Sequence, residues 1–206
     1  VRDYLSERGV PAMLDGIQDS GQRAAKIVKN MLNFSRKRDG EYTLQSLPGL
    51  LDTTLELAAS DYNLKKEYDF KKIEILRQYQ PGMPEVLCER NEIQQVFLNI
   101  FKNGAEAMSE KRFETEQPCF TIRVRAEQAM AVVEIEDNGP GIPDEQLNRI
   151  MEPFYTTKAV GKGTGLGLSV SYFIVTVQHQ GSLEVASTPG AWTRFTIRLP
   201  LPADAG

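Results

Sequence analysis

Four segments in the second half of the chain alternate apolar and polar residues, and this alternation limits the chain to folds built around an amphipathic sheet. The segments are residues 120–125, 131–136, 182–186 and 193–199, and residues 73–77 repeat the pattern earlier in the chain. A period of two is typical of strands that bury one face. Stretches of helical periodicity occur among them, at residues 50–63, 91–109 and 166–178, without the regular strand–helix alternation of a doubly wound sheet. We therefore predict an α+β fold, a two-layer α/β sandwich with helices covering one face of the sheet.

A long helical repeat precedes this sandwich. Apolar or small side chains recur at intervals of three and four residues, at Leu14, Ile17, Gly21, Ala24, Val28, Met31 and Ser35. The 3.5-residue period is typical of a coiled coil or helical bundle, and the additional apolar residues Met13, Ile27, Leu32 and Phe34 favour the bundle. Because a single helix cannot bury such a stripe, the repeat needs a partner helix, a second copy of the chain, or the C-terminal domain as its contact surface. We predict two domains, residues 1–38 and residues 39–206.

The composition restricts the partners and the compartment of the protein. A net charge of −4 provides no basic face, so we expect no nucleic-acid partner. No apolar run approaches about 20 residues, so we expect a cytoplasmic fragment whose only membrane attachment would come from segments ahead of Val1. Cys88 and Cys119 lack the spacing of metal ligands, and we expect both to be small buried hydrophobic residues.

A glycine-punctuated turn, Asp137-Asn-Gly-Pro-Gly-Ile-Pro, follows the strand predicted over residues 131–136. Gly139 and Gly141 allow the backbone to turn sharply and to approach a ligand closely. The Asp137 carboxylate can accept a hydrogen bond from an exocyclic amine, and Ile142 offers an apolar wall to a flat ring. Taken alone, an Asp-Asn-Gly triplet is more often an ordinary turn.

A second glycine-rich segment, residues 161–169, leads into the helix predicted from Leu166. Its four glycines alternate with other residues. Backbone N–H groups at a helix N-terminus, approached through glycines, can bind phosphate. The spacing matches neither the Walker A sequence nor the dinucleotide-binding fingerprint. The alternative is a flexible loop.

Asn99 and Asn103 lie one turn apart on the helix predicted over residues 91–109, and Glu106 lies near the same face. Amide oxygens are hard ligands of the kind that Mg²⁺ accepts together with phosphate oxygens and water. The alternative is a solvated helix face, but apolar residues on both sides of these positions indicate that the face is partly buried.

These elements together resemble the nucleotide-binding domain of sensor histidine kinases. The asparagine helix resembles the family's N box, residues 137–142 its first glycine box, residues 153–158 its F box, and residues 163–169 its second glycine box. Residues 190–200 are similar to its closing strand motif, so the resemblance covers about residues 44–200. Residues 17–36 resemble the second helix of the family's dimerisation and phosphotransfer bundle, whose acceptor histidine lies on a first helix that this chain does not contain.

The resemblance implies a Bergerat-type ATP-binding fold and a protein-histidine kinase with ATP and Mg²⁺ as cofactors. Asp137 would recognise the adenine amino group, and Asn103 would ligate Mg²⁺. Asn99 would support Asn103 or contact phosphate, and Glu106 would assist as a base or orient a histidine. The residues that it places at the nucleotide are Asn99, Asn103, Asp137, Gly139, Gly141, Ile142, Phe154, Tyr155, Thr157, Lys158, Gly163, Thr164, Gly165, Leu166, Gly167, Leu168 and Thr193.

The partners that the resemblance implies are a second copy of the intact kinase and a response-regulator receiver domain. The γ-phosphate of ATP would pass to the histidine of the first bundle helix and then to the regulator's aspartate. Without that helix, we expect the fragment to be inactive in autophosphorylation. The sole histidine, His179, follows a predicted helix, where a capping role is expected rather than phosphorylation.

Two other classes of protein remain as alternatives. A gyrase-type or chaperone-type ATPase of the same superfamily carries a glutamate base at the position of Asn99, and an amide cannot take a proton from water. A non-hydrolysing signalling scaffold would be expected to have degraded glycine boxes, whereas these are intact. Trp192 departs from the glycine usual in the closing motif, although Thr193 is retained.

Overall fold

The computed structural model describes residues 13, 21, 41–60, 70–158 and 163–202. The predicted bundle helix and the domain boundary after residue 38 therefore lie outside the described residues, apart from Met13 and Gly21. No helix among the described residues is long and apolar enough to cross a membrane.

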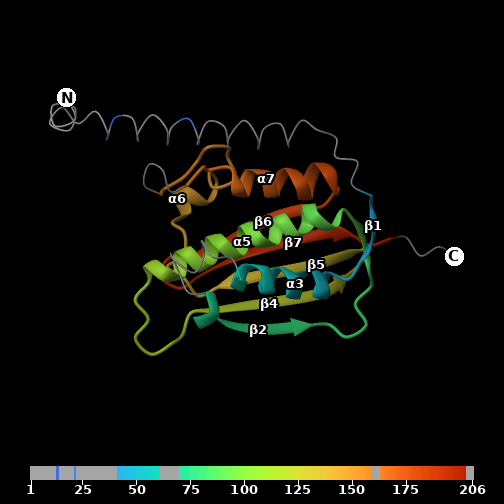
Figure 1. The fold of residues 1–206 in the computed structure, drawn as a ribbon, viewed down its shortest axis with the longest axis horizontal. Coiled ribbons are helices and arrows are strands. Elements are labelled where there is room, and N and C mark those ends of the chain that lie inside the picture. The colour runs from blue at the N-terminus through green and yellow to red at the C-terminus, as the bar shows by residue number, and fades with distance from the viewer. Residues whose placement is uncertain (1–12, 14–20, 22–40, 61–69, 159–162, 203–206) are drawn as a thin grey trace, which may run out of the picture.

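A five-stranded sheet forms the centre of the described part (Figure 1). Its strands, in spatial order, are β2 (Glu74–Tyr79), β4 (Cys119–Glu127), β5 (Met130–Asp137), β7 (Trp192–Pro200) and β6 (Ser182–Thr188). β2 runs parallel to β4, and the other neighbouring pairs are antiparallel. A separate two-stranded sheet pairs β1 (Thr43–Gln45) with β3 (Val86–Cys88).

Helices cover one face of the five-stranded sheet, as Figure 1 shows. They are α3 (Leu47–Ser60), α5 (Arg90–Glu110) and α7 (Gly167–Phe173). The shorter helical segments are η1 (Phe70–Lys72), α6 (Asp144–Leu147) and η2 (Ile174–Gln178). The apolar stripe of α5, including Phe97 and Phe101, is buried in one core with the inward residues of β4 and β5. Phe101 and Phe120 meet edge to face with ring centroids 5.4 Å apart. The predicted two-layer sandwich is confirmed.

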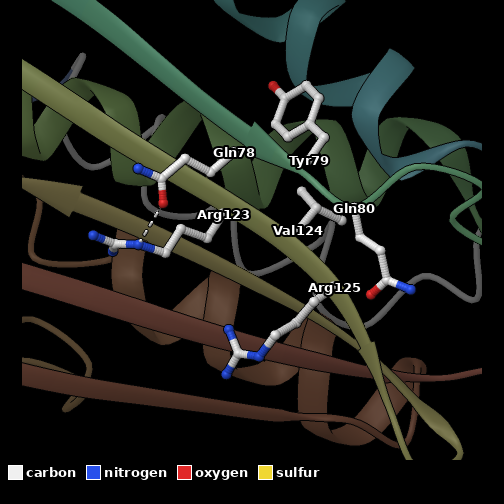
Figure 2. A pocket seen from close by; sticks show the side chains of 6 residues that line it. All are labelled: Gln78, Tyr79, Gln80, Arg123, Val124 and Arg125. Atoms are coloured by element: carbon white, nitrogen blue, oxygen red, sulfur yellow. Dashed lines mark hydrogen bonds between the residues drawn. The ribbon is translucent and has the colours of Figure 1, made fainter.

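The opposite face of the sheet carries a ladder of arginine and glutamate side chains. Arg125 contacts Glu134 at 2.8 Å, and Arg123 contacts Glu136 at 3.4 Å. A hollow where β2 runs beside β4 is lined by Gln78, Tyr79, Gln80, Arg123, Val124 and Arg125 (Figure 2). None of the residues predicted to bind nucleotide lines this hollow, so it lies apart from the predicted site.

The structure differs from the sequence-based prediction in three places. β1 and β3 have three residues each and α6 has four, too few to produce a recognisable period. The helix predicted over residues 166–178 is α-helical only to Phe173, because residues 174–178 form the π-helical turn η2, closed by a 3.1 Å bond from the His179 N–H to the Ile174 carbonyl. Cys88 is fully buried as expected, whereas Cys119 is only partly buried.

Candidate nucleotide-binding site

Asp137 is the last residue of β5, and only 4% of it is exposed. Its Oδ1 accepts a 3.0 Å hydrogen bond from the backbone N–H of Gly139. Desolvation, with a smaller contribution from the nearby Glu136 carboxylate, raises the pKa of Asp137 to about 7. The Gly139 hydrogen bond and the Lys111 ammonium lower this pKa but do not cancel the rise. The strand therefore delivers a buried carboxylate that binds or releases a proton near neutral pH.

The turn after Asp137 is anchored on both sides. The Lys111 ammonium, at the end of α5, donates to the carbonyls of Asn138 at 2.7 Å and Gly139 at 3.1 Å. Gly141 has φ +71°, and a Cβ there would collide with the carbonyl of Thr188. The Asp-Asn-Gly segment is thus more than an isolated turn, because it is docked on α5 and on the β6–β7 hairpin.

A hydroxyl cluster lies on β7 and β6, the next two strands of the sheet after β5. Thr193 is directly opposite Asp137 in the β5–β7 register and is buried. The Ser187 hydroxyl lies 3.2 Å from the Thr193 hydroxyl, donates to the Trp192 carbonyl, and accepts the Ile142 N–H at 2.8 Å. This bond fixes the backbone of Ile142 against the sheet, beside the Asp137 turn.

Gly104 allows α5 to approach the Asp137 carboxylate. A Cβ at position 104 would lie 2.6 Å from the Phe120 ring and 3.1 Å from Asp137 Oδ2. Any side chain there would fill the space beside the carboxylate, so the helix needs glycine at this position for close packing.

Asn99 connects α5 to the start of α7. Its Nδ2 donates to the Gly167 carbonyl and to the Ser171 hydroxyl, both at 3.1 Å. The side chain is half-buried against α7, so this part of the predicted asparagine face is a helix–helix contact rather than a solvated surface.

Asn103 and Glu106, one turn further along α5, share a cationic partner. The Lys158 ammonium lies 2.6 Å from Glu106 Oε2 and 3.4 Å from Asn103 Oδ1. The Lys158 and Glu106 side chains are 30% and 22% exposed, so solvent partly screens the ion pair. The structure therefore brings the proposed metal ligand and a lysine from the F-box segment to one position.

The F-box segment packs directly on the second glycine segment. The Phe154 N–H donates to the Gly165 carbonyl at 2.8 Å, and a Cβ at Gly165, which has φ +64°, would collide with the Phe154 backbone. A Cβ at Gly163 would lie 2.6 Å from the Thr156 hydroxyl and 3.0 Å from Lys158 Cδ. These glycines therefore permit a close approach of two chain segments.

The remaining predicted site residues surround this junction. The Thr164 hydroxyl accepts the Leu166 N–H at 3.4 Å, and the Tyr155 ring lies 4.5 Å below the Arg149 guanidinium. Phe154 and Thr157 are exposed, Leu168 is half-buried, and Leu166 is buried.

His179 lies away from these groups, at the end of η2. It is buried, its Nε2 accepts the backbone N–H of Glu89, and its Nδ1 lies 2.9 Å from the Ile174 carbonyl. The capping position predicted for His179 is confirmed. Because both ring nitrogens have partners within the fold, the side chain is not presented for phosphorylation.

Sequence reasoning missed several residues of the site. Gly104, Lys111, Asn138 and Ser187 each hold a predicted residue or turn in place. Gly104 and Asn138 carried a sequence signal, because a glycine inside a strong helical pattern indicates close packing and an Asp-Asn-Gly triplet indicates a turn.

The two-layer fold and the polar face of α5, which contacts both glycine segments, define a nucleotide-binding domain. Residues 88–203 match the family described as "Histidine kinase-, DNA gyrase B-, and HSP90-like ATPase". This match covers more than half of the chain, and the chain belongs to that family.

Curated relatives are named as kinases, and several of them as histidine kinases. The chain is 31% identical over 184 residues to sporulation kinase E of Bacillus subtilis (strain 168), a match that covers 89% of this chain and 23% of the relative. It is 34% identical over 195 residues to the sensory histidine kinase/phosphatase NtrB of Vibrio alginolyticus, covering 90% of this chain and 51% of that protein. The chain thus spans between about a quarter and a half of these two relatives.

Solved structures share the fold. The catalytic domain of histidine kinase ThkA superposes with a TM-score of 0.63 at 25% identity, covering 78% of this chain and 96% of that one. Full-length ShkA in complex with AMPPNP superposes with a TM-score of 0.70 at 20% identity, over 95% of this chain and 40% of that chain, and this likeness supports the fold alone. The sequence-based resemblance to sensor histidine kinases is confirmed.

Proposed function

We propose that this chain is the ATP-binding catalytic domain of a sensor histidine kinase, which transfers the γ-phosphate of ATP to a histidine for relay to a response-regulator aspartate. One observation carries the proposal: a single helix, α5, contacts both glycine segments, through Gly104 beside Asp137 and through Asn99 beside Gly167. In this proposal, adenine lies where Gly104 approaches Asp137, and the phosphates lie along the part of α5 that carries Asn99 and Asn103.

The adenine end is the Asp137 side of α5. The Asp137 carboxylate accepts a hydrogen bond from the exocyclic amino group of adenine, and Ile142 packs against the adenine ring. Gly139 and Gly141 keep the turn free of side chains next to the ligand. The Thr193 hydroxyl, opposite Asp137, supplies a further polar group at this end.

The phosphate end is the part of α5 that carries Asn99 and Asn103, beside the second glycine segment and Lys158. The cation already near Asn103 Oδ1 indicates that this oxygen suits positive charge, and Asn103 would hold Mg²⁺ there. When bound, the metal neutralises charge on the phosphates, which is a large part of what phosphoryl transfer requires. Lys158, Thr157 and residues 163–167 would contact the phosphates. The other residues placed at the nucleotide on this side are Asn99, Phe154, Tyr155 and Leu168.

The polar contacts of Asn99 favour a kinase over an ATPase. Its Nδ2 donates to two groups of α7, and an amide has no basic site that could take a proton from water. In a kinase the acceptor imidazole is itself the nucleophile, so no such base is needed. The rival function is an ATP-binding scaffold without transfer activity.

The partners and the compartment follow from the same proposal. The proposed partners are a second copy of the chain, bound through the bundle helix, and a response-regulator receiver domain. The proposed compartment is the cytoplasm. Because the chain spans only part of its relatives, these assignments concern the whole protein rather than the described residues.

The test incubates γ-labelled ATP with this chain alone and with a version extended at its N-terminus to include an acceptor helix. The extended protein should gain an acid-labile, base-stable phosphoryl group, as expected for phosphohistidine, while the chain alone should release phosphate at close to the background rate. Rapid phosphate release by the chain alone would support the ATPase alternative. ATP binding without any transfer in the extended protein would support the scaffold.

A further inference from the structure

Three polar groups from two segments meet at one point beside the proposed phosphate end. Lys158 Nζ lies 2.6 Å from Glu106 Oε2 and 3.4 Å from Asn103 Oδ1. Asn103 and Glu106 project from successive turns of α5, whereas Lys158 belongs to the segment that packs on the second glycine segment. The ammonium therefore connects the rigid helix to the phosphate-binding loops.

The two oxygens that flank this ammonium are also suitable ligands for a small divalent cation. Carboxylate and amide oxygens are hard ligands, and Mg²⁺ binds such oxygens at about 2.0–2.1 Å. A metal on Asn103 Oδ1 would lie within a few ångströms of the present position of Nζ, where two positive charges repel each other. The metal and the ammonium cannot both use this position.

We propose that Lys158 and Mg²⁺ are alternative occupants of one cation position formed by Asn103 and Glu106, and that arrival of the metal–nucleotide transfers Lys158 to the phosphates. The inference rests on the proposed function, since it requires nucleotide at this end of α5. Glu106 is then a positioning residue that retains Lys158 until the metal replaces it, rather than a base.

The packing of the lysine side chain allows such an exchange. Lys158 Cδ is the atom that a Cβ at Gly163 would meet at 3.0 Å, so the stem lies against a glycine without a side chain to block it. The Phe154–Gly165 backbone hydrogen bond anchors the same segment four residues earlier. The ammonium can therefore change partner by side-chain rotation while the backbone remains anchored.

The test measures the affinity of a fluorescent, non-hydrolysable ATP analogue with and without Mg²⁺. The proteins are the parent chain, Glu106→Gln, Lys158→Met and the double variant. Glu110→Gln removes an exposed carboxylate one turn further along α5 and serves as the matched control. Thermal unfolding of each variant confirms that it is folded.

In the absence of Mg²⁺, Glu106→Gln should bind the analogue about two- to fivefold more tightly than the parent. The reason is that the substitution removes the partly screened ion pair with Glu106, so that Lys158 is free to contact the phosphates. Its gain in affinity on adding Mg²⁺ should be smaller than that of the parent. The effect of Glu106→Gln without metal should disappear in the Lys158→Met background, and Glu110→Gln should resemble the parent.

Two results would overturn the exchange. One is an affinity of Glu106→Gln for the analogue without Mg²⁺ that is unchanged or weaker than that of the parent. An unchanged affinity would mean that the Lys158–Glu106 ion pair does not affect nucleotide binding, and a weaker one that the pair positions Lys158 for the phosphates. The other is a gain that persists in the Lys158→Met background, which would mean that Glu106 simply repels the phosphates. If the parent chain itself binds no ATP analogue, the proposed function fails instead, so the two failures are distinguishable.

Discussion

The Asp137 carboxylate accepts a hydrogen bond from the backbone N–H of Gly139 at 3.0 Å while only 4% of the residue is exposed. This single bond does not offset the cost of burying the charge, and the pKa of Asp137 rises from 3.8 to about 7. The unfolded chain loses this proton at lower pH than the folded chain. The contribution of Asp137 to the free energy of unfolding is therefore largest below pH 3.8 and declines as pH rises to about 7.

Nucleoside binding should have the opposite pH dependence. The ionised carboxylate is the stronger acceptor for an adenine amino group, so affinity for adenosine should fall by up to about tenfold per pH unit below pH 7 and level off above it. Adenosine is the suitable ligand because it carries no phosphate that titrates. Calorimetry across this range should also detect proton release on binding near neutral pH.

The matched control for this profile is Asp137→Asn, in which the titrating group is removed. Its weaker adenosine affinity should be independent of pH over the same range. A parent protein with a flat profile, or a variant with the parent's slope, would remove Asp137 as the group responsible.

Asn103→Ala should separate nucleotide binding from metal use. The substitution removes the proposed Mg²⁺ ligand and leaves the Asp137 end of α5 untouched, so nucleotide should still bind. The increase in affinity on adding Mg²⁺ should shrink markedly relative to the parent in a fluorescence titration. If the magnesium dependence is unchanged, Asn103 does not hold the metal.

Asn99→Asp tests the connection between α5 and α7. The substitution exchanges an amide donor for a carboxylate that faces the Gly167 carbonyl, and loss of a hydrogen bond at a half-buried position costs about 1–3 kcal/mol. Urea unfolding should show this loss. Gln95→Glu makes the same amide-to-acid change on the exposed side of α5 and should leave the unfolding free energy nearly unchanged. Equal effects of the two substitutions would contradict the assigned contact.

The helical repeat from Leu14 to Ser35 remains a prediction from sequence, because almost all of it lies outside the described residues. We expect this chain to be a monomer or to associate weakly. A charge within the apolar repeat, Val28→Glu, should abolish any dimer in sedimentation analysis without changing ATP affinity. Gln22→Glu, which lies outside the repeat, should leave any dimer intact. A dimer that survives Val28→Glu would place the interface elsewhere.

Regular patterns made most of the fold predictable. β7 alternates over all nine residues, β4 over most of its nine, and β5 over its last five, and α5 has apolar residues on one face throughout its length, so both periods are readily recognised. Three-residue strands such as β1 and β3 contain too little pattern to identify. The π-helical turn after Phe173 depends on how residues 174–181 pack, which periodicity does not encode.

The candidate site was predictable where chemistry and spacing coincide in the sequence. Asp137, Asn99 and Asn103 stand out because glycines or helical spacing surround them. The contacts that hold them do not, since Lys111 reaches the Asp137 turn across 27 positions and Lys158 reaches Glu106 across 52. Such pairs are set by tertiary packing, so the competition inferred for Lys158 is visible only in the structure.

The most direct test of the account is the affinity of the parent chain and of Asp137→Asn for ATP and GTP in the presence of Mg²⁺. The parent should bind ATP in preference to GTP, because guanine presents a carbonyl where adenine presents its amino group. Asp137→Asn should bind ATP about ten- to a hundredfold more weakly, which is the equivalent of one charge-assisted hydrogen bond. It should also lose most of the preference for ATP over GTP. Parent-like ATP affinity in Asp137→Asn, or a parent chain that binds neither nucleotide, would contradict the account.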